Sequence, residues 1–287
     1  MSRGPYINFA PAIKRVELDL RDDGVDVDAG HWQGYDTKGK PDLVTREILD
    51  VHLPIACARD GVTYHGDFTY LDQIASEIKP NRAWADEHFA ERVGGTPMNP
   101  DPSHERWPWW RGQNVSKQAG EGQQFTHTYS ERFWPKRAHE PSEFTDRHNL
   151  LTMKGIRYDY GDLNDLVNLL VKEPRTRQAY LPIFFPEDTG AVHGGRIPCT
   201  LGYQFMLRTD PMGYDRLHCW YHIRSCDYVR HFRDDLYLAV CLMRWVLDSC
   251  YAHDLDNPLW REARLGNLYF TCASMHYHHG DEKHVAP

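Results

Sequence analysis

The sequence lacks the features that would assign the chain to a membrane or secreted class. Its longest apolar run, Leu236–Leu247, is short and is interrupted by Arg244. A run of that length does not span a bilayer. The first twenty residues contain no apolar core of the kind found in signal peptides. We therefore expect no membrane association and no export.

The sequence also lacks paired cysteines and an excess of basic residues. Its seven cysteines include no Cys-x-x-Cys pair, and the formal net charge is -8. An odd number of unpaired cysteines is typical of free thiols in the cytoplasm. An acidic chain has no general attraction for nucleic acid or membrane surfaces. An anionic ligand therefore has to be bound by a local group of basic residues.

No Ser/Gly-rich linker, low-complexity segment or internal repeat divides the 287 residues. The length fits one large domain or two small ones, and the absence of a linker favours a single domain, residues 1–287. Apolar periodicity predicts several elements. The predicted strands are Ile48–Ile55, Thr200–Arg208 and Arg216–Ile223, and the predicted helices are Asn81–Val93, Asp162–Lys172 and Leu236–Leu247.

Chemically reactive residues are concentrated between Arg196 and Asp235. Pro198-Cys199 precedes one predicted strand, and the next strand ends in the run Arg224-Ser225-Cys226-Asp227. Asp235 follows eight residues after Asp227. This segment supplies a thiol, a guanidinium beside a hydroxyl, and two carboxylates. Such groups can hold a phosphorylated substrate while a thiolate attacks it.

The order and spacing of these residues resemble the thymidylate synthase superfamily. Besides Pro198-Cys199 and Arg224–Asp227, the resemblance is carried by Gln204-Phe205 and Ser274-Met275-His276, and weaker matches reach back to about residue 36. It implies an α/β fold in which helices surround a large twisted mixed sheet. It also implies a two-fold dimer through the sheets, and 5,10-methylenetetrahydrofolate as the one-carbon donor.

The resemblance implies a catalytic nucleophile, a phenol and a carboxylate. Cys199 matches the nucleophile, and Tyr129 matches an active-site phenol. The family carries a glutamate seven residues before a glycine. Counting back from Gly94 gives Glu87, and Glu91, one turn later, is the alternative.

The resemblance also implies residues that bind substrate and folate. Arg224 and Ser225 match contacts to the substrate, and Gln204 belongs to the same matched block. His276 falls where a histidine bonds the sugar 3′-hydroxyl. Asp227 falls at a carboxylate that contacts the pterin.

Further phosphate ligands are expected at two basic turns. Near the N-terminus the family uses an arginine, and this sequence offers Lys38 or Arg46. In the family, two adjacent arginines also reach into the partner's site. Here Arg177 matches the first, Gln178 replaces the second, and Arg175 could compensate.

A histidine cluster, His276, His278 and His279, raises the question of a metal. It has no acidic or thiolate partner at ligand spacing in the sequence, so we predict no metal site. The family carries a tyrosine where His278 stands, and Tyr277 is an alternative match.

The chemistry explains the need for Cys199. A free cysteine titrates at about 8.5, and neighbouring arginines such as Arg224 lower that value. A thiolate that adds to C6 of a pyrimidine makes C5 nucleophilic enough to attack a one-carbon unit. The methylene group then formed on the base becomes a methyl group with hydride, or a hydroxymethyl group with water.

Asp235 indicates which base is used. Thymidylate synthases have an asparagine at this position, which accepts from uracil N3–H and donates to O4. A carboxylic acid instead matches cytosine, because it can donate to N3 and accept from the N4 amino group. Similar cytidylate hydroxymethylases carry Asp there. If the register shifts by one residue, Asp234 takes the same role.

These residues predict a pyrimidine nucleotide 5-hydroxymethylase that acts on CMP or dCMP. The alternatives are a thymidylate synthase that methylates dUMP, and a non-catalytic family member that binds nucleotide or RNA. The expected partners are a pyrimidine nucleoside monophosphate, the folate and a second copy of the chain. Neither nucleic acid nor a membrane is expected as the main partner.

Overall fold

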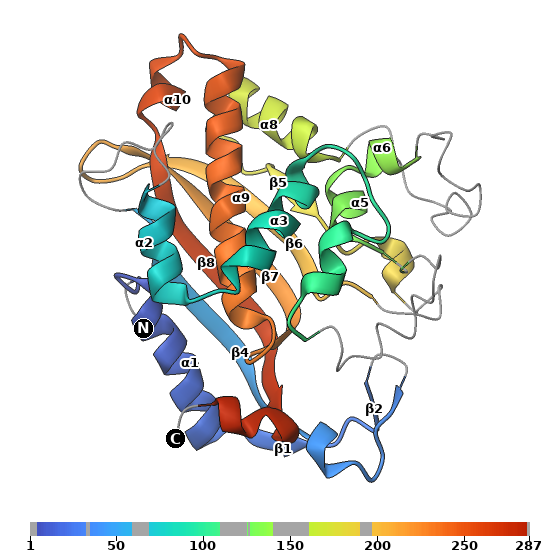
Figure 1. The fold of residues 1–287 in the computed structure, drawn as a ribbon. Coiled ribbons are helices and arrows are strands. Elements are labelled where there is room, and N and C mark those ends of the chain that lie inside the picture. The colour runs from blue at the N-terminus through green and yellow to red at the C-terminus, as the bar shows by residue number, and fades with distance from the viewer. Residues whose placement is uncertain are drawn as a thin grey trace.

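The computed structural model describes residues 5–32, 35–58, 69–109, 125, 127–139, 161–189 and 197–285. A mixed sheet of six strands lies at its centre (Figure 1), in the order β1-β4-β8-β7-β6-β5. Strands β7 and β8 are parallel, and all other neighbours are antiparallel. The bounds are β1 (Val25–Val27), β4 (Thr45–Ala56), β5 (Tyr180–Pro182), β6 (Thr200–Thr209), β7 (Asp215–Asp227) and β8 (Arg264–His278), with β2 (His31–Trp32) and β3 (Tyr35–Asp36) forming a separate pair.

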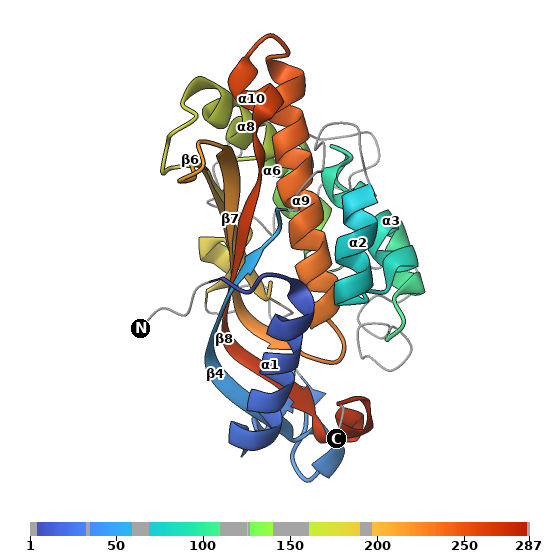
Figure 2. The same ribbon diagram turned by 90° about the vertical axis from the view of Figure 1, so that its left-hand side faces the viewer.

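Helices pack against one face of this sheet. Figure 2 shows α2, α3 and α9 on the same side of the strands, whereas the described part of the chain places no helix over the other side. The bounds are α1 (Phe9–Asp23), α2 (Thr69–Ile78), α3 (Arg82–Val93), α5 (Tyr129–Phe133), α6 (Pro135–His139), α8 (Leu163–Lys172), α9 (Phe232–His253) and α10 (Pro258–Glu262). Short 3-10 turns are η1 (Pro41–Leu43), η2 (Pro102–Arg106), η4 (Pro186–Asp188) and η5 (His279–His284).

Helix α9 organises the core. Its apolar positions recur at helical spacing, and Leu236, Val240, Met243 and Leu247 are fully buried. The helix packs on β7 and β8 and is itself covered by α2, α3 and α8. The buried apolar residues form one continuous cluster. The N-terminus of α9, where the acidic residues lie, is therefore fixed beside the ends of the two parallel strands.

Alternation along β6 and β7 divides the sheet into two faces. Tyr203 and Tyr221 point toward the helices and are buried. Gln204 and Trp220 point the other way and are half-buried, and Trp220 stacks on Tyr269 with ring centroids 4.4 Å apart. We refer to this second, helix-free face as the open face.

The six segments predicted from periodicity are all confirmed, and most extend further than predicted. The predicted strand Ile48–Ile55 is part of Thr45–Ala56, and the predicted helix Leu236–Leu247 is the middle of Phe232–His253. All seven cysteines are free thiols. None of the helices in the described residues combines the length and apolarity needed to cross a membrane.

Candidate active site

Cys199 lies directly before β6 and is half-buried. The backbone N–H of Arg224 on β7 donates to the Cys199 carbonyl at 2.8 Å. The Arg224 guanidinium donates from Nε to the Pro198 carbonyl at 2.9 Å and from Nη2 to the Ile197 carbonyl at 3.1 Å. Arg224 therefore holds the turn that presents the thiol, and its Nη1 has no acceptor among the described residues.

Three hydroxyl groups line up next to the cysteine. The Tyr129 and Thr200 hydroxyls lie 3.0 Å apart, and the Thr200 and Tyr221 hydroxyls lie 2.9 Å apart. Burial raises the pKa of Tyr129 to about 12, so its phenol stays protonated at neutral pH. We call Cys199, Thr200, Tyr129, Tyr221 and Asp235 the thiol cluster. Its hydroxyls can pass a proton along a short chain.

Asp235 joins this cluster from the first turn of α9. Burial raises the pKa of Asp235 to about 7, while the positive charge of Arg92 opposes that rise. The Cys226 thiol donates to Asp235 Oδ2 at 3.6 Å. Asp234 has a different role, because its carboxylate accepts from the Asn81 N–H at 2.7 Å, at the start of α3. Of the two adjacent acids, Asp235 is thus the one beside the thiol cluster.

A second group of polar residues gathers where β7 and β8 end. The parallel register pairs Asp227 with His276 and Ser225 with Ser274. Asp227 Oδ1 accepts from the Val229 and Arg230 N–H groups at 3.0 Å each.

Asp227, His276 and His278 offer ligand atoms that all lie within 4.8 Å of one another. The expectation that the histidines have no acidic partner was therefore wrong, because strand pairing supplies Asp227 from a distant part of the sequence. Burial lowers the pKa of His276 to about 4, so its ring is neutral at pH 7. The Arg230 guanidinium lies 3.7 Å from Asp227 and competes with any cation for that carboxylate.

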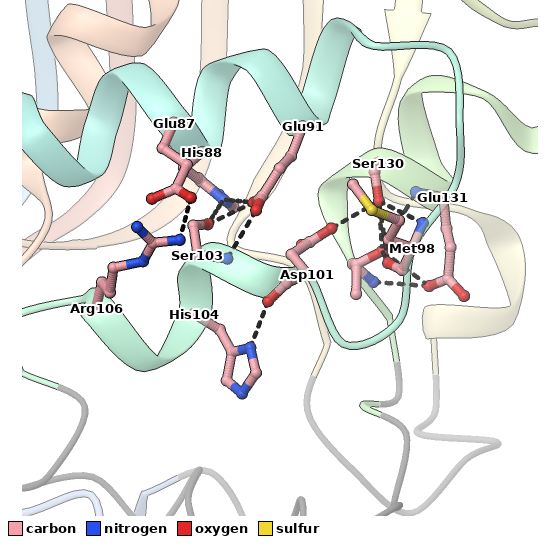
Figure 3. Close-up of polar contacts among 11 residues, drawn as sticks. Glu87, His88, Glu91, Met98, Asp101, Ser103, His104, Arg106, Ser130 and Glu131 are labelled. Carbon is pink, nitrogen blue, oxygen red and sulfur yellow. Dashed lines mark hydrogen bonds and ion pairs between the residues drawn. The ribbon is translucent and has the colours of Figure 1, made fainter.

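The two candidate glutamates of α3 leave the same side of the helix but have different partners (Figure 3). Glu87 is ion-paired with the exposed Arg106. Glu91 is buried, and its carboxylate accepts from the Ser103 N–H at 2.7 Å and from the Ser103 hydroxyl. Burial alone would raise the pKa of Glu91, but hydrogen bonds from His88 and Ser103 leave it below its usual value. These contacts do not bring the predicted Glu87 to the thiol cluster.

Two of the predicted substrate ligands have other partners. The Arg46 guanidinium donates to the Leu20 and Arg21 carbonyls of α1 and pairs with Asp26. These contacts hold the Arg46 side chain against α1 and β1, and the choice between Lys38 and Arg46 as the N-terminal phosphate ligand stays a prediction. Gln204 lies on the open face, where its amide donates to the Arg177 carbonyl at 2.9 Å.

The two remaining basic candidates are exposed. Lys38 lies in the turn that follows β3, and Arg177 lies in the segment between α8 and β5. No described residue of the thiol cluster contacts either side chain. As predicted ligands they stay predictions, and Arg177 is expected to act in a partner's site.

One surface cavity, of about 410 Å³, lies between α1 and β4, and Cys199 does not line it. The smaller cavity, about 170 Å³, adjoins Asp234 and is lined by Asn81, Trp109, Arg230 and His231 among others. The position of the smaller cavity makes it the better candidate for a ligand site, because it lies next to the end of β7 and the start of α9. Its aromatic and basic lining suits a flat, anionic molecule.

Among solved structures, the chain is similar to the thermostable thymidylate synthase A from Bacillus subtilis. The TM-score is 0.61, with 13% sequence identity over 97% of this chain and 82% of that chain. The chain has the thymidylate synthase fold. No protein-family model matches the sequence, and no curated protein matches it either. The α/β fold that the resemblance implied is therefore confirmed by structure rather than by sequence similarity.

Within this thymidylate synthase fold, sequence reasoning missed one charged residue. Arg92, in the last turn of α3, lies with its guanidinium carbon 4.0 Å above the centre of the Tyr129 ring. In the sequence, the one indication of a role for Arg92 was that it directly follows Glu91, a candidate catalytic residue. Tyr203, which stacks on Tyr221 at 4.5 Å, was also missed. Strand alternation could have identified Tyr203 as helix-facing.

Proposed function

We propose that this protein is a pyrimidine nucleotide 5-hydroxymethylase that acts on CMP or dCMP. The observation that carries the proposal is Asp235, a carboxyl group with a pKa near 7 beside Cys199 and Tyr129. The thymidylate synthase fold supports folate-dependent one-carbon transfer to C5 of a pyrimidine nucleotide in general. Asp235 supports cytosine as the base. The proposal takes residues 1–287 as one catalytic domain.

Cys199 acts as the nucleophile in this proposal. Its thiolate adds to C6 of the base, and the C5=C6 electron pair moves through C4 to N3 of cytosine. Carbon 5 then carries enamine character and can form a new carbon–carbon bond. Arg224 holds the cysteine turn through the Pro198 and Ile197 carbonyls. In this proposal its positive charge also favours the thiolate form of Cys199.

Asp235 reads the base. At pH 7 a carboxyl with a pKa of about 7 is close to half protonated. In its protonated form it donates to N3 and accepts from the N4 amino group. Uracil presents a donor at N3 and an acceptor at O4, so an ionised carboxylate accepts from N3–H but faces the O4 lone pairs without a donor, and one of the two buried contacts is lost. Such a loss costs roughly 1–3 kcal/mol.

The residues around Asp227 suit the folate donor. Asp227 is buried, and the nearby Val229 and Arg230 line the smaller cavity, whose aromatic and basic side chains suit the flat pterin ring. When bound there, the folate supplies the one-carbon unit. In the same proposal His276 binds the sugar, and the phosphate is bound by Ser225, by Lys38 or Arg46, and by Arg177 of a partner copy.

The test is turnover with CMP, dCMP and dUMP in the presence of 5,10-methylenetetrahydrofolate, read by product mass. We expect a cytosine nucleotide to gain the mass of a hydroxymethyl group. A methyl group on dUMP would instead establish the thymidylate synthase alternative. Binding without turnover of any of the three nucleotides would establish a non-catalytic member.

A further inference from the structure

Arg92 is a buried cation that forms no ion pair with any described residue. The residue is 4% exposed, and its buried Nε has no hydrogen-bond acceptor among the residues that the structure describes. No carboxylate or carbonyl of the described residues accepts from its guanidinium. Its guanidinium carbon lies 4.0 Å from the centre of the Tyr129 ring. A cation over an aromatic ring offsets only part of the cost of burial.

The other buried arginines of the described chain each have a carboxylate partner in direct contact, which Arg92 lacks. Arg132 is bonded to both oxygens of Asp188, at 2.9 and 3.0 Å. Arg244 is ion-paired with Asp248. A buried charge without such a partner is strongly unfavourable. Arg92 therefore has no carboxylate in direct contact among the described residues, and only the longer-range charges of acids such as Asp234 and Asp235 oppose its own.

The surroundings of Arg92 are the groups of the candidate site. Its positive charge acts on Tyr129, Tyr203 and Asp235, and on Asp234 next to it. Asp235 is near enough for the charge of Arg92 to oppose the rise of its pKa, yet the two side chains form no ion pair. A guanidinium offers only donors, whereas an ionised carboxylate offers only acceptors.

We propose that Arg92 is a ligand-binding residue whose guanidinium donates to an acceptor atom of the pyrimidine ring. This inference rests on the proposed function. The ring's acceptors are its carbonyl oxygens and, in cytosine, N3. Addition of the Cys199 thiolate at C6 pushes electron density onto these same atoms. A fixed donor facing them binds the charged adduct more strongly than the neutral base.

The experiment compares wild type with Arg92→Met and Arg92→Lys by calorimetric binding of CMP, dCMP and dUMP, without folate. Arg92→Met should weaken binding of the preferred nucleotide about ten- to hundredfold, as expected for losing a hydrogen bond from a charged group. Arg92→Lys keeps the charge but loses the planar donors, so its nucleotide affinity should lie between those of wild type and Arg92→Met. Inorganic phosphate, as a second probe, should bind wild type and Arg92→Met equally.

Thermal unfolding of the ligand-free proteins separates a binding role from a structural one. Arg92→Met removes an uncompensated buried charge, so its melting temperature should equal or exceed that of wild type. The matched control Arg244→Met breaks an ion pair, so it should melt lower yet keep nucleotide affinity.

Three outcomes would overturn the assignment. Equal nucleotide affinity in wild type and Arg92→Met would do so, as would a lower melting temperature for Arg92→Met. Loss of phosphate affinity in Arg92→Met would make Arg92 a phosphate ligand instead. If wild type binds no pyrimidine nucleotide, the proposed function itself fails, and this inference fails with it.

Discussion

At the scale of single residues, Asp235 decides the choice of base. Asp235→Asn replaces an acid that donates to N3 with an amide that accepts from uracil N3–H. We expect the ratio of kcat/KM for the cytosine nucleotide to that for dUMP to fall about 5- to 150-fold, since roughly 1–3 kcal/mol separates a paired from an unpaired buried group. Steady-state kinetics of both proteins on both nucleotides measure this ratio.

The same residue predicts a pH dependence. Burial raises the pKa of Asp235 to about 7, and the protonated form is the one that donates to N3. Affinity for the cytosine nucleotide should therefore decline as pH rises through about 7. Asp235→Asn should show no decline over that range. An unchanged base preference and a flat wild-type profile would leave Asp235 as a helix-start acid favoured by the dipole of α9.

At the scale of elements, a buried ion pair fixes α5, the helix that begins with Tyr129. Arg132 on α5 bonds Asp188 of η4 through two nitrogens, and both side chains are almost fully buried. Asp188→Ala leaves that guanidinium without its carboxylate and should lower the free energy of unfolding by roughly 3–5 kcal/mol.

Urea unfolding measures this loss. The control is Asp72→Ala, which breaks the exposed pair between Asp72 and Arg82 and should change stability little. Equal effects of the two substitutions would show that α5 is not held by Arg132 and Asp188.

The sequence predicted elements well where periodicity was strong, as in β6 and α9. It did not reveal β8, although β8 lies in the middle of the sheet. That strand contains Gly266 and Asn267, two residues that are uncommon in strands. Its alternation of buried and exposed side chains is also interrupted near Ala273, opposite Asp50, whose φ is positive. The alternation of apolar and polar residues was therefore too weak to predict β8, and its pairing with β4 and β7 decides its structure.

Candidate residues were predictable where they lie close together in sequence. Cys199, Arg224 and Asp235 are brought together by one hairpin and the following helix. The direction of side chains on α3 was not predictable, since Glu87 and Arg92 differ by little more than one turn and tertiary packing sets the rotation. The contact between Asp227 and His276 depends on a parallel pairing that no local pattern encodes.

At the scale of the whole molecule, the open face supports the proposed dimer. It carries stacked aromatic side chains, and the exposed Arg177 lies beside it through its contact with Gln204. If Arg177 serves the partner's site, Cys199→Ser and Arg177→Ala should complement each other. One site of each mixed dimer would then contain neither substitution.

We expect the mixture of these two inactive proteins to recover up to about a quarter of wild-type activity, because random exchange makes half of the dimers mixed and each has one intact site. Subunit exchange is followed with differently tagged chains. Proven exchange without recovered activity would contradict a shared site.

The central claim is that the Cys199 thiolate adds to C6 of a cytosine nucleotide. Addition alone makes C5 exchange its hydrogen with solvent, even without folate, because the adduct is protonated at C5 before the thiolate leaves. The most direct measurement is therefore the loss of the C5–H proton signal of CMP and dCMP in deuterium oxide. We predict that wild type and the control Cys250→Ala catalyse this exchange on a cytosine nucleotide and that Cys199→Ser does not. Exchange by Cys199→Ser at the wild-type rate, or no exchange by wild type on any pyrimidine nucleotide, would contradict the account.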